Sequence, residues 1–173
     1  IELSPRKDKA AALEEVGRDI PHGGYGRSLF LRAAAEHWMM AGDTDRARAL
    51  LADIERDPPE GDLHTHSIQL QLAFQLGDAE WASALLELLL AEFRADRVTT
   101  STCHHVGELL EEEGDLRKAH RWFTLPLSNV DPDEELDVLE EMCVQGRDRV
   151  RRELGLPHDR YDAVALELGP DGA

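Results

Sequence analysis

Aromatic residues, cysteines and long apolar runs are scarce in this chain. Phe, Trp and Tyr account for 5% of the 173 residues, and extended alternations of Val, Ile and Thr are missing, which argues against a β fold. Two cysteines do not supply the disulfide framework of a small secreted domain. The apolar run over 84–91 contains Glu87 and is too short to cross a bilayer, and no signal peptide is evident. We therefore expect a cytoplasmic protein without a membrane partner.

Positive charge is also scarce. The sequence has 19 Lys and Arg residues against 36 Asp and Glu residues, which gives a formal net charge of −17 at pH 7. Such a surface repels nucleic-acid backbones and anionic membranes, so we expect no nucleic-acid partner. A solvated acidic surface is the simpler interpretation of this charge, and a basic partner is the alternative. The chain starts at Ile1 rather than at Met, so we expect a segment upstream of it.

The chain does contain an internal repeat. A Gly-Asp pair occurs at 42–43, 77–78 and 114–115, at intervals of 35 and 37 residues. Self-similarity at this period is typical of helical-hairpin arrays, in which stacked neighbours bury a continuous core. Gly ends one helix in the left-handed conformation, and the Asp or the residue after it caps the next. A small residue stands five positions after each Gly, where it permits close helix packing: Ala47, Ala82 and Ala119.

The apolar periodicity and the abundance of Ala, Leu, Glu and Arg predict an all-α fold. We expect a first helix that Ser4-Pro5 opens, over 5–19, followed by helices over 27–40, 44–56, 63–76, 79–94, 98–113, 116–129, 133–145 and 159–168. Pro126 should kink or shorten its helix, and Gly146 should break or bend the helix that starts at 133. The residues expected to face inward are Ala11, Ala12, Leu13 and Val16 in the first helix, and Leu136, Leu139, Met142 and Cys143 in the helix over 133–145.

The region from Ser28 to Pro132 resembles the tetratricopeptide repeat family. The residues that carry the resemblance are Ala34, Ala35, Trp38, Ala47, Leu51, Pro58 and Pro59 in repeat one, Leu70, Ala73, Ala82, Leu86 and Leu89 in repeat two, and Val106, Gly107, Leu110, Ala119, Phe123 and Pro132 in repeat three. Repeat two lacks the final Pro, and Pro126 stands where the family has a small residue. The resemblance implies a right-handed superhelix of three antiparallel helix pairs. The chain then divides into an N-terminal helix and linker (1–26), three hairpins (27–132), and C-terminal capping helices with a tail (133–173).

A second resemblance rests on the stretches 119–124 and 149–157. They look like parts of helical-repeat proteins of high-GC bacteria, some of which are linked to a metal-binding SEC-C motif. The Cys-rich signature of that motif is absent here, so no metal function is carried over.

In the tetratricopeptide family, the first helix of each hairpin lines a concave groove that binds a peptide. The family register implies a groove lined by Leu29, Arg32, Glu36, Met39, Met40, His64, Ser67, Gln71, Phe74, Gln75, Ser101, His104, Glu108, Glu111 and Glu112. This groove would have an apolar floor of Met39, Met40 and Phe74 and an acidic wall of Glu108, Glu111 and Glu112. Such a surface suits a peptide or helix with apolar anchors and Lys or Arg. The alternative is that Met39 and Phe74 are buried under a neighbouring helix.

Histidines and a cysteine raise a second hypothesis, a metal-linked or enzyme-accessory module that uses His64, His104 and Cys103. His64 and His66 are two positions apart, which on a helix would direct them to different sides. A zinc site needs three or four ligands, so surface histidines are the simpler interpretation, and we assign no metal and no cofactor. The cysteine beside His104 has poor geometry for a nucleophile, and we expect both cysteines, at 103 and 143, to be core residues.

Three further motifs have structural explanations that we prefer. The glycines of 23–26 precede a helix but lack the Lys-Ser/Thr of a phosphate loop, so we interpret them as a linker. The carboxylate runs 111–113 and 140–141 are typical of solvated helix faces rather than of a desolvated catalytic pair. The only basic block, 147–152, could clasp an acidic partner or nucleic acid. The alternative is an intramolecular role, in which it neutralises the acidic array or flanks Val150 and Leu154 as they pack on the last repeat, and we favour that alternative.

These observations predict a non-catalytic scaffold that binds a protein or peptide segment of basic character. The metal-linked module is one alternative. Another is a homo-oligomer in which the groove is filled by a terminal helix of a neighbouring copy.

Overall fold

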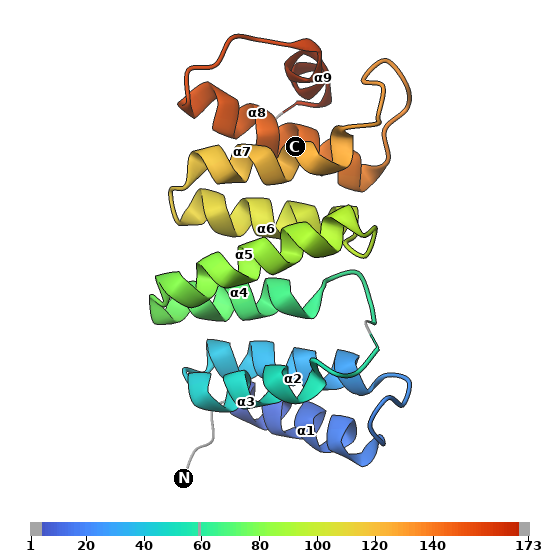
Figure 1. Ribbon diagram of the computed structural model, residues 1–173, viewed down its shortest axis with the longest axis vertical. Coiled ribbons are helices and arrows are strands. Elements are labelled where there is room, and N and C mark those ends of the chain that lie inside the picture. Colours follow the sequence, from blue (N-terminus) through green and yellow to red (C-terminus); the bar gives the residue numbers. More distant parts are fainter. Residues whose placement is uncertain (1–4, 59, 170–173) are drawn as a thin grey trace. The chain divides into compact units, whose positions relative to one another are not determined.

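A computed structural model describes residues 5–58 and 60–169 of the chain (Figure 1). Over these residues the chain forms helices and no β-strand, which confirms the all-α prediction. The helices are α1 (Pro5–Asp19), α2 (Arg27–Met40), α3 (Thr44–Ile54), α4 (Thr65–Leu76), α5 (Ala79–Arg94), α6 (Thr100–Glu112), α7 (Leu116–Thr124), the 3₁₀ helix η1 (Leu125–Leu127), α8 (Val138–Glu153) and α9 (Arg160–Leu168). They fall into two compact units, unit 1 (Ile1–Ala95) and unit 2 (Asp96–Ala173). The predicted cap Ser4, Pro59 and the tail after 169 lie outside the described residues.

The three Gly-Asp turns have the predicted local structure. The glycines at 42, 77 and 114 have φ values of 81°, 67° and 76°, the left-handed region that glycine adopts without a Cβ clash. The next residue caps the following helix, because the side chains of Asp43, Asp78 and Asp115 each accept a hydrogen bond from the backbone N–H three residues later. The small residues at 47, 82 and 119 are buried. The repeat therefore encodes the turn between the two helices of each hairpin.

In unit 1, α1 packs on α2, and the pairs α2–α3 and α4–α5 form two hairpins (Figure 1). The hairpins meet where α3 contacts α4, and α2 also touches α4. The central core of α2, α3 and α4 consists of large apolar side chains such as Leu31, Trp38, Leu50, Leu51 and Ile68.

The buried face of α1 differs from the prediction. The buried residues are Ala10, Glu14 and Gly17, and of the expected stripe only Leu13 packs partly against the core. Ala11 and Ala12 are exposed, and Val16 is 45% exposed. The helix is therefore rotated relative to the face that hydrophobicity alone selects.

Glu14 and Gly17 explain this rotation. The Glu14 carboxylate accepts hydrogen bonds from Nε of Arg18 at 2.9 Å, Nε of Arg46 at 2.8 Å and Nε1 of Trp38 at 3.0 Å. Burial by itself raises the pKa of Glu14, but the bonds from Arg46, Arg18 and Trp38 bring that pKa below its ordinary value. At Gly17 a Cβ atom would lie 2.6 Å from a methyl carbon of Leu31, so glycine permits α1 to approach α2.

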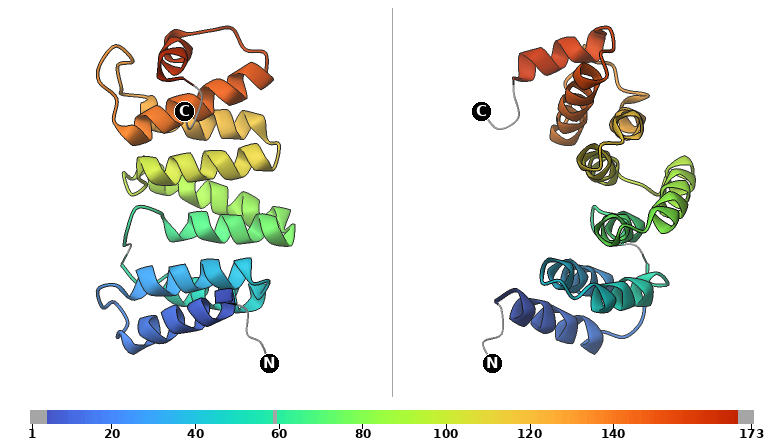
Figure 2. Two further views of the ribbon diagram at one scale, coloured as in Figure 1. Left: turned by 180° about the vertical axis from the view of Figure 1, so that it is seen from behind. Right: turned by 90° about the vertical axis from the view of Figure 1, so that its left-hand side faces the viewer.

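In unit 2, α6 and α7 form the third hairpin, α8 packs on both, and α9 packs on α8 (Figure 2). As predicted, Pro126 shortens its helix: α7 ends at Thr124 and the chain continues as the 3₁₀ helix η1. Of the predicted break or bend at Gly146, the break is wrong, because α8 continues through this residue to Glu153. The residues 133–137, which were expected to open this helix, are not helical. The helix starts at Val138 instead, because Asp137 and Glu140 form a capping box there.

The ring of Phe123 explains why Gly146 stands inside a helix. A Cβ atom on Gly146 would lie 2.6 Å from Cε1 of Phe123, and a Cβ atom on Gly107 of α6 would lie equally close. The fully buried ring therefore lies against two glycines, one on each neighbouring helix. Of the residues expected inward near the start of α8, only Cys143 is fully buried; Leu136 is half-buried, and Leu139 and Met142 are 36% and 38% exposed.

Five other helix ends differ from the expected positions by one or two residues, among them the end of α6 at Glu112 instead of 113 and the start of α9 at Arg160 instead of 159. The helix expected over 44–56 ends at Ile54. The helix expected from 63 starts at Thr65, because the side chain of His64 accepts a hydrogen bond from the backbone N–H of His66. The helix expected from 98 starts at Thr100, because the side chain of Thr99 caps it.

Candidate functional site

The predicted groove residues of the first two hairpins lie on two helices of unit 1 that touch, α2 and α4. Arg32 ties α2 to the connection that leads into α4, where its Nη1 donates to the carbonyl oxygens of Glu60 at 3.1 Å and Leu63 at 2.5 Å. Gln75 on α4 bonds to α2 directly, because its Nε2 donates to the Met39 carbonyl oxygen at 3.2 Å. These side-chain bonds fix the relative position of α2 and α4.

Most, but not all, of the predicted residues on these helices reach the surface. We call the accessible set the α2–α4 face: Leu29, Arg32, Glu36, Met40, His64, Gln71, Phe74 and Gln75. Met40 is the most open apolar member at 52% exposure, and Phe74 is half-buried. Two members of the predicted groove are corrected. Met39 is only 3% exposed and belongs to the core, and Ser67 is fully buried with its hydroxyl bonded to the His64 carbonyl oxygen.

Glu36 is the electrostatically unusual residue of the α2–α4 face. Burial raises the pKa of its carboxyl group, and the nearby Arg32 offsets this only in part. The Nε atom of Arg32 is 4.0 Å from the Glu36 carboxylate, while its Nη1 atom is already bonded to two carbonyl oxygens. Met40 follows Glu36 by one helical turn, so a partly desolvated carboxylate stands beside an exposed thioether.

The two histidines at the start of α4 do not point apart as predicted. Their ring centroids are 4.9 Å from each other. His64 precedes the first turn of α4 with extended backbone angles, φ −70° and ψ 138°, so helical spacing does not apply to it. The Nε2 atom of His64 lies 3.9 Å from the Glu92 carboxylate of α5, and His66 bonds to Gln69.

The predicted acidic wall lies on α6 in unit 2, and one of its members is neutralised within the protein. Glu111 accepts two hydrogen bonds of 3.1 Å from the guanidinium of Arg149 on α8. The side chain of Glu108 is 47% exposed, Glu112 is exposed, and Ser101 is half-buried. His104 is corrected, because it is 8% exposed and its ring lies against Phe123.

The residues of the metal hypothesis, His64, His104 and Cys103, are not grouped as ligands of one metal ion. In the described part of the chain, no three His, Cys, Asp or Glu side chains are grouped so that they could hold a metal ion. Cys103 and Cys143 are free thiols with no exposed surface, as predicted for core residues. Burial raises the pKa of each thiol to about 12, which disfavours the thiolate that ligation or nucleophilic attack requires.

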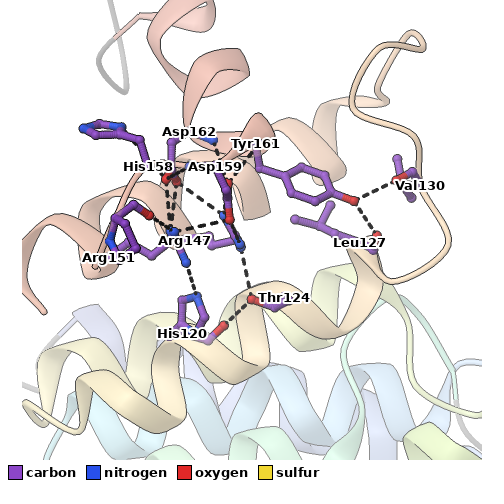
Figure 3. Close-up of polar contacts among 11 residues, drawn as sticks. His120, Thr124, Leu127, Val130, Arg147, Arg151, His158, Asp159, Tyr161 and Asp162 are labelled. Atoms are coloured by element: carbon purple, nitrogen blue, oxygen red, sulfur yellow. Dashed lines mark hydrogen bonds and ion pairs between the residues drawn. The ribbon is translucent and has the colours of Figure 1, made fainter. Parts of the chain in front are cut away.

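The basic block of α8 is bonded to α9, as Figure 3 shows. Nη1 and Nη2 of Arg147 contact the carboxylate of Asp159 at 3.1 and 2.5 Å. Nε of Arg151 is 3.1 Å from both oxygens of Asp162, which is 2% exposed. The hydrogen bonds from Arg147 hold the pKa of Asp159 down at about 2. The block is therefore intramolecular for these two arginines, as favoured, but their partners lie at the start of α9 and not in the acidic array.

Arg147, Arg151, Asp159 and Asp162 form a charged cluster, and residues of neighbouring segments make further polar contacts beside it (Figure 3). His120 on α7 lies with Nε2 3.5 Å from Arg151, and burial followed by repulsion from the two arginines lowers its pKa. The Tyr161 hydroxyl of α9 lies 2.8 and 2.7 Å from the carbonyl oxygens of Leu127 and Val130. The cluster thus fastens α9 to α8 and to the segment after α7. Asp159 and Asp162 were missed in the sequence, although their Asp-x-x-Asp spacing is that of a capping box.

The glycine loop before α2 is occupied by carboxylates of the chain itself. The backbone N–H of Gly26 donates to the Glu60 carboxylate at 2.7 Å, and the Ser28 hydroxyl donates to the same group at 2.6 Å. The N–H of Gly23 donates to Asp57 at 3.0 Å. The loop therefore holds the end of the first repeat, which agrees with a linker rather than a phosphate-binding loop.

Comparisons of the chain with protein-family models, with curated proteins and with solved structures found no match. Among the helices of the described residues, none has the length and apolar character needed to cross a membrane.

Proposed function

We propose that the protein is a non-catalytic scaffold that binds a basic segment of a partner protein on the α2–α4 face. The proposal includes a tetratricopeptide-like arrangement of the three hairpins as a right-handed superhelix. The turn geometry at 42–43, 77–78 and 114–115 and the buried alanines that follow support that arrangement. In such arrays the first helix of each hairpin faces the ligand, and α2 and α4 are those helices.

The observation that carries the proposal is the position of Glu36. A carboxylate that is partly desolvated, and whose nearest cation is 4.0 Å away, gains electrostatic energy when a Lys or Arg of a partner approaches it. Met40 provides adjacent apolar area with an adaptable side chain. The bonds of Arg32 and Gln75 hold the two helices in place before binding, so little ordering energy is lost.

The partner's chemistry follows from the charge of the chain. With a net charge of −17, the protein attracts a cationic segment over long range and repels acidic ones. A segment with one Lys or Arg next to an apolar residue matches Glu36 and Met40. We expect its affinity to fall with added salt, because the charges lie at the surface.

The test compares two double variants of the full chain in capture of proteins from an extract of the source cells. Glu36→Gln with Met40→Ala removes the charge and the apolar side chain of the α2–α4 face. Glu87→Gln with Leu88→Ala is the matched control, because both residues are exposed on α5, the second helix of its hairpin. We expect a protein that wild type and control retain and the face variant loses, with its Kd raised on the order of tenfold or more.

Equal retention by all three proteins would contradict the assignment of the face. Circular dichroism of each variant verifies that helix content is unchanged. If the retained protein does not bind more weakly at higher salt, the proposed basic character of the partner is wrong.

A further inference from the structure

A concave surface lies wholly within unit 2, between the segment 132–136, the start of α8 and α9. It is a cleft of about 520 Å³. Apolar side chains in its lining include Leu136, Val164 and Leu168, which also pack against the small core of α8 and α9. The walls of the cleft are therefore held by the fold of unit 2.

Carboxylates dominate the charged lining of this cleft. They include Glu134, Glu135, Glu141 and Glu167, and in the described part of the chain none of these four has a cationic side chain as a partner. The only basic residue that the cleft contains among the described residues is Arg160. Its guanidinium is already paired with Asp131 at 3.1 Å and Asp133 at 2.5 Å.

We propose that this cleft docks a basic amphipathic segment of a partner protein. A Lys or Arg side chain suits the cleft, because its aliphatic stem packs on the apolar walls and its charged group contacts the carboxylates. Near the start of α8, outside the lining of the cleft, three apolar side chains are exposed and offer contacts to a segment that extends beyond the cleft: Val138 at 70%, Leu139 at 36% and Met142 at 38% exposure. The site is distinct from the α2–α4 face and does not depend on the function proposed for it.

Charge and geometry favour this occupant over two others. A second copy of the chain is a poor partner, because both copies carry a net charge of −17 and repel each other, and the basic block of each is paired internally through Arg147, Arg149 and Arg151. A divalent cation needs several ligands around one point, and no group of three suitable side chains occurs among the described residues. A peptide instead distributes its charges along the cleft.

The experiment titrates the full chain into a fluorescent peptide of about four helical turns, in which Lys and Leu recur at helical spacing and Ala fills the rest. Fluorescence anisotropy gives the Kd at about 50 and 200 mM NaCl. Glu141→Gln with Glu167→Gln should raise the Kd about tenfold at the lower salt concentration. The matched control, Glu113→Gln with Glu153→Gln, removes two exposed charges elsewhere in unit 2 and should change the Kd less than twofold.

Each remaining outcome decides against the proposal. Equal Kd values for the two double variants would mean that the peptide senses only the overall charge. Loss of binding in Glu36→Gln with Met40→Ala, but not in the cleft variant, would place the peptide on the α2–α4 face. Displacement of the peptide by CaCl₂ more strongly than by NaCl of equal ionic strength would assign the cleft to a divalent cation. A dimer in sedimentation equilibrium that the cleft variant abolishes would assign it to a second copy.

Discussion

The contact between Gly146 and Phe123 permits a test in which local and tertiary effects have opposite signs. Gly146 lies inside α8, where replacing glycine by alanine normally stabilises a helix by about 1 kcal/mol. Here the new Cβ would lie 2.6, 2.7 and 2.9 Å from three carbons of the Phe123 ring. The ring cannot move toward α6, because the space left by Gly107 is already filled by the same ring carbons.

We therefore expect Gly146→Ala to reduce the free energy of unfolding. Forcing a methyl group into a filled core costs about 1–3 kcal/mol. The upper end applies because the ring is confined on both sides, and subtracting the helix-propensity gain leaves a net loss of about 2 kcal/mol. Urea unfolding followed by circular dichroism at 222 nm measures this change.

A double-mutant cycle assigns the loss to the ring. Phe123→Leu shortens the side chain and should be destabilising by itself, since the site is fully buried. In that background Gly146→Ala should become neutral or stabilising, which gives a coupling energy of about 2 kcal/mol or more. If Gly146→Ala stabilises the protein that retains Phe123, the overpacking argument is refuted.

Three more predictions concern ionisable groups. Glu36→Gln should raise the melting temperature at pH 7 and have no effect near pH 4, because burial raises the pKa of Glu36 in the folded state and its ionised form opposes folding only above the unfolded pKa. Thermal melts at the two pH values measure this, and a lower melting temperature at pH 7 would contradict it. The pKa of Asp159 is depressed from 3.8 to about 2, so its stabilising contribution is present above pH 3.8 and disappears as the pH falls through 2; Asp159→Asn should flatten the acid limb of the stability profile. Cys103 and Cys143 should not react with a thiol reagent at pH 8 in the native protein and should both react in urea, because each is buried with a pKa of about 12; rapid native labelling would mean that unit 2 opens readily.

Local signals in the sequence predicted the hairpin turns well. The Gly-Asp pairs specify backbone conformation and capping within five residues, and the helices over 27–40 and 79–94 have the expected bounds. Pro126 likewise acts on its own turn, through the hydrogen bond it cannot donate. These features needed no knowledge of the tertiary structure.

Apart from the helix starts that the local caps His64, Thr99 and Asp137 set, the errors occur where a distant residue decides the outcome. Glu14 is buried because Arg46 and Trp38, on two other helices, donate to its carboxylate, and no hydrophobicity pattern reports this. Gly146 continues a helix because a ring from α7 fills the space beside it.

The sequence predicted the candidate site only in part. The family register located accessible residues such as Met40 and Gln75, but a rotation of a fraction of a turn placed Met39 and Ser67 in the interior. The sequence pattern also could not predict that Arg149 pairs with Glu111, because the two residues are 38 positions apart.

The carboxylates of Asp57 and Glu60 have a consequence for how such a chain diversifies. They close the first repeat on itself, because they bond to glycine N–H groups that precede its first helix. If another repeat without Asp57 and Glu60 replaced the first one, those N–H groups would lose their acceptors. The three repeats therefore cannot be exchanged for one another without loss of these bonds. A consensus sequence averaged over the three repeats would erase both residues, and the averaged protein would lose the tie that closes its first repeat.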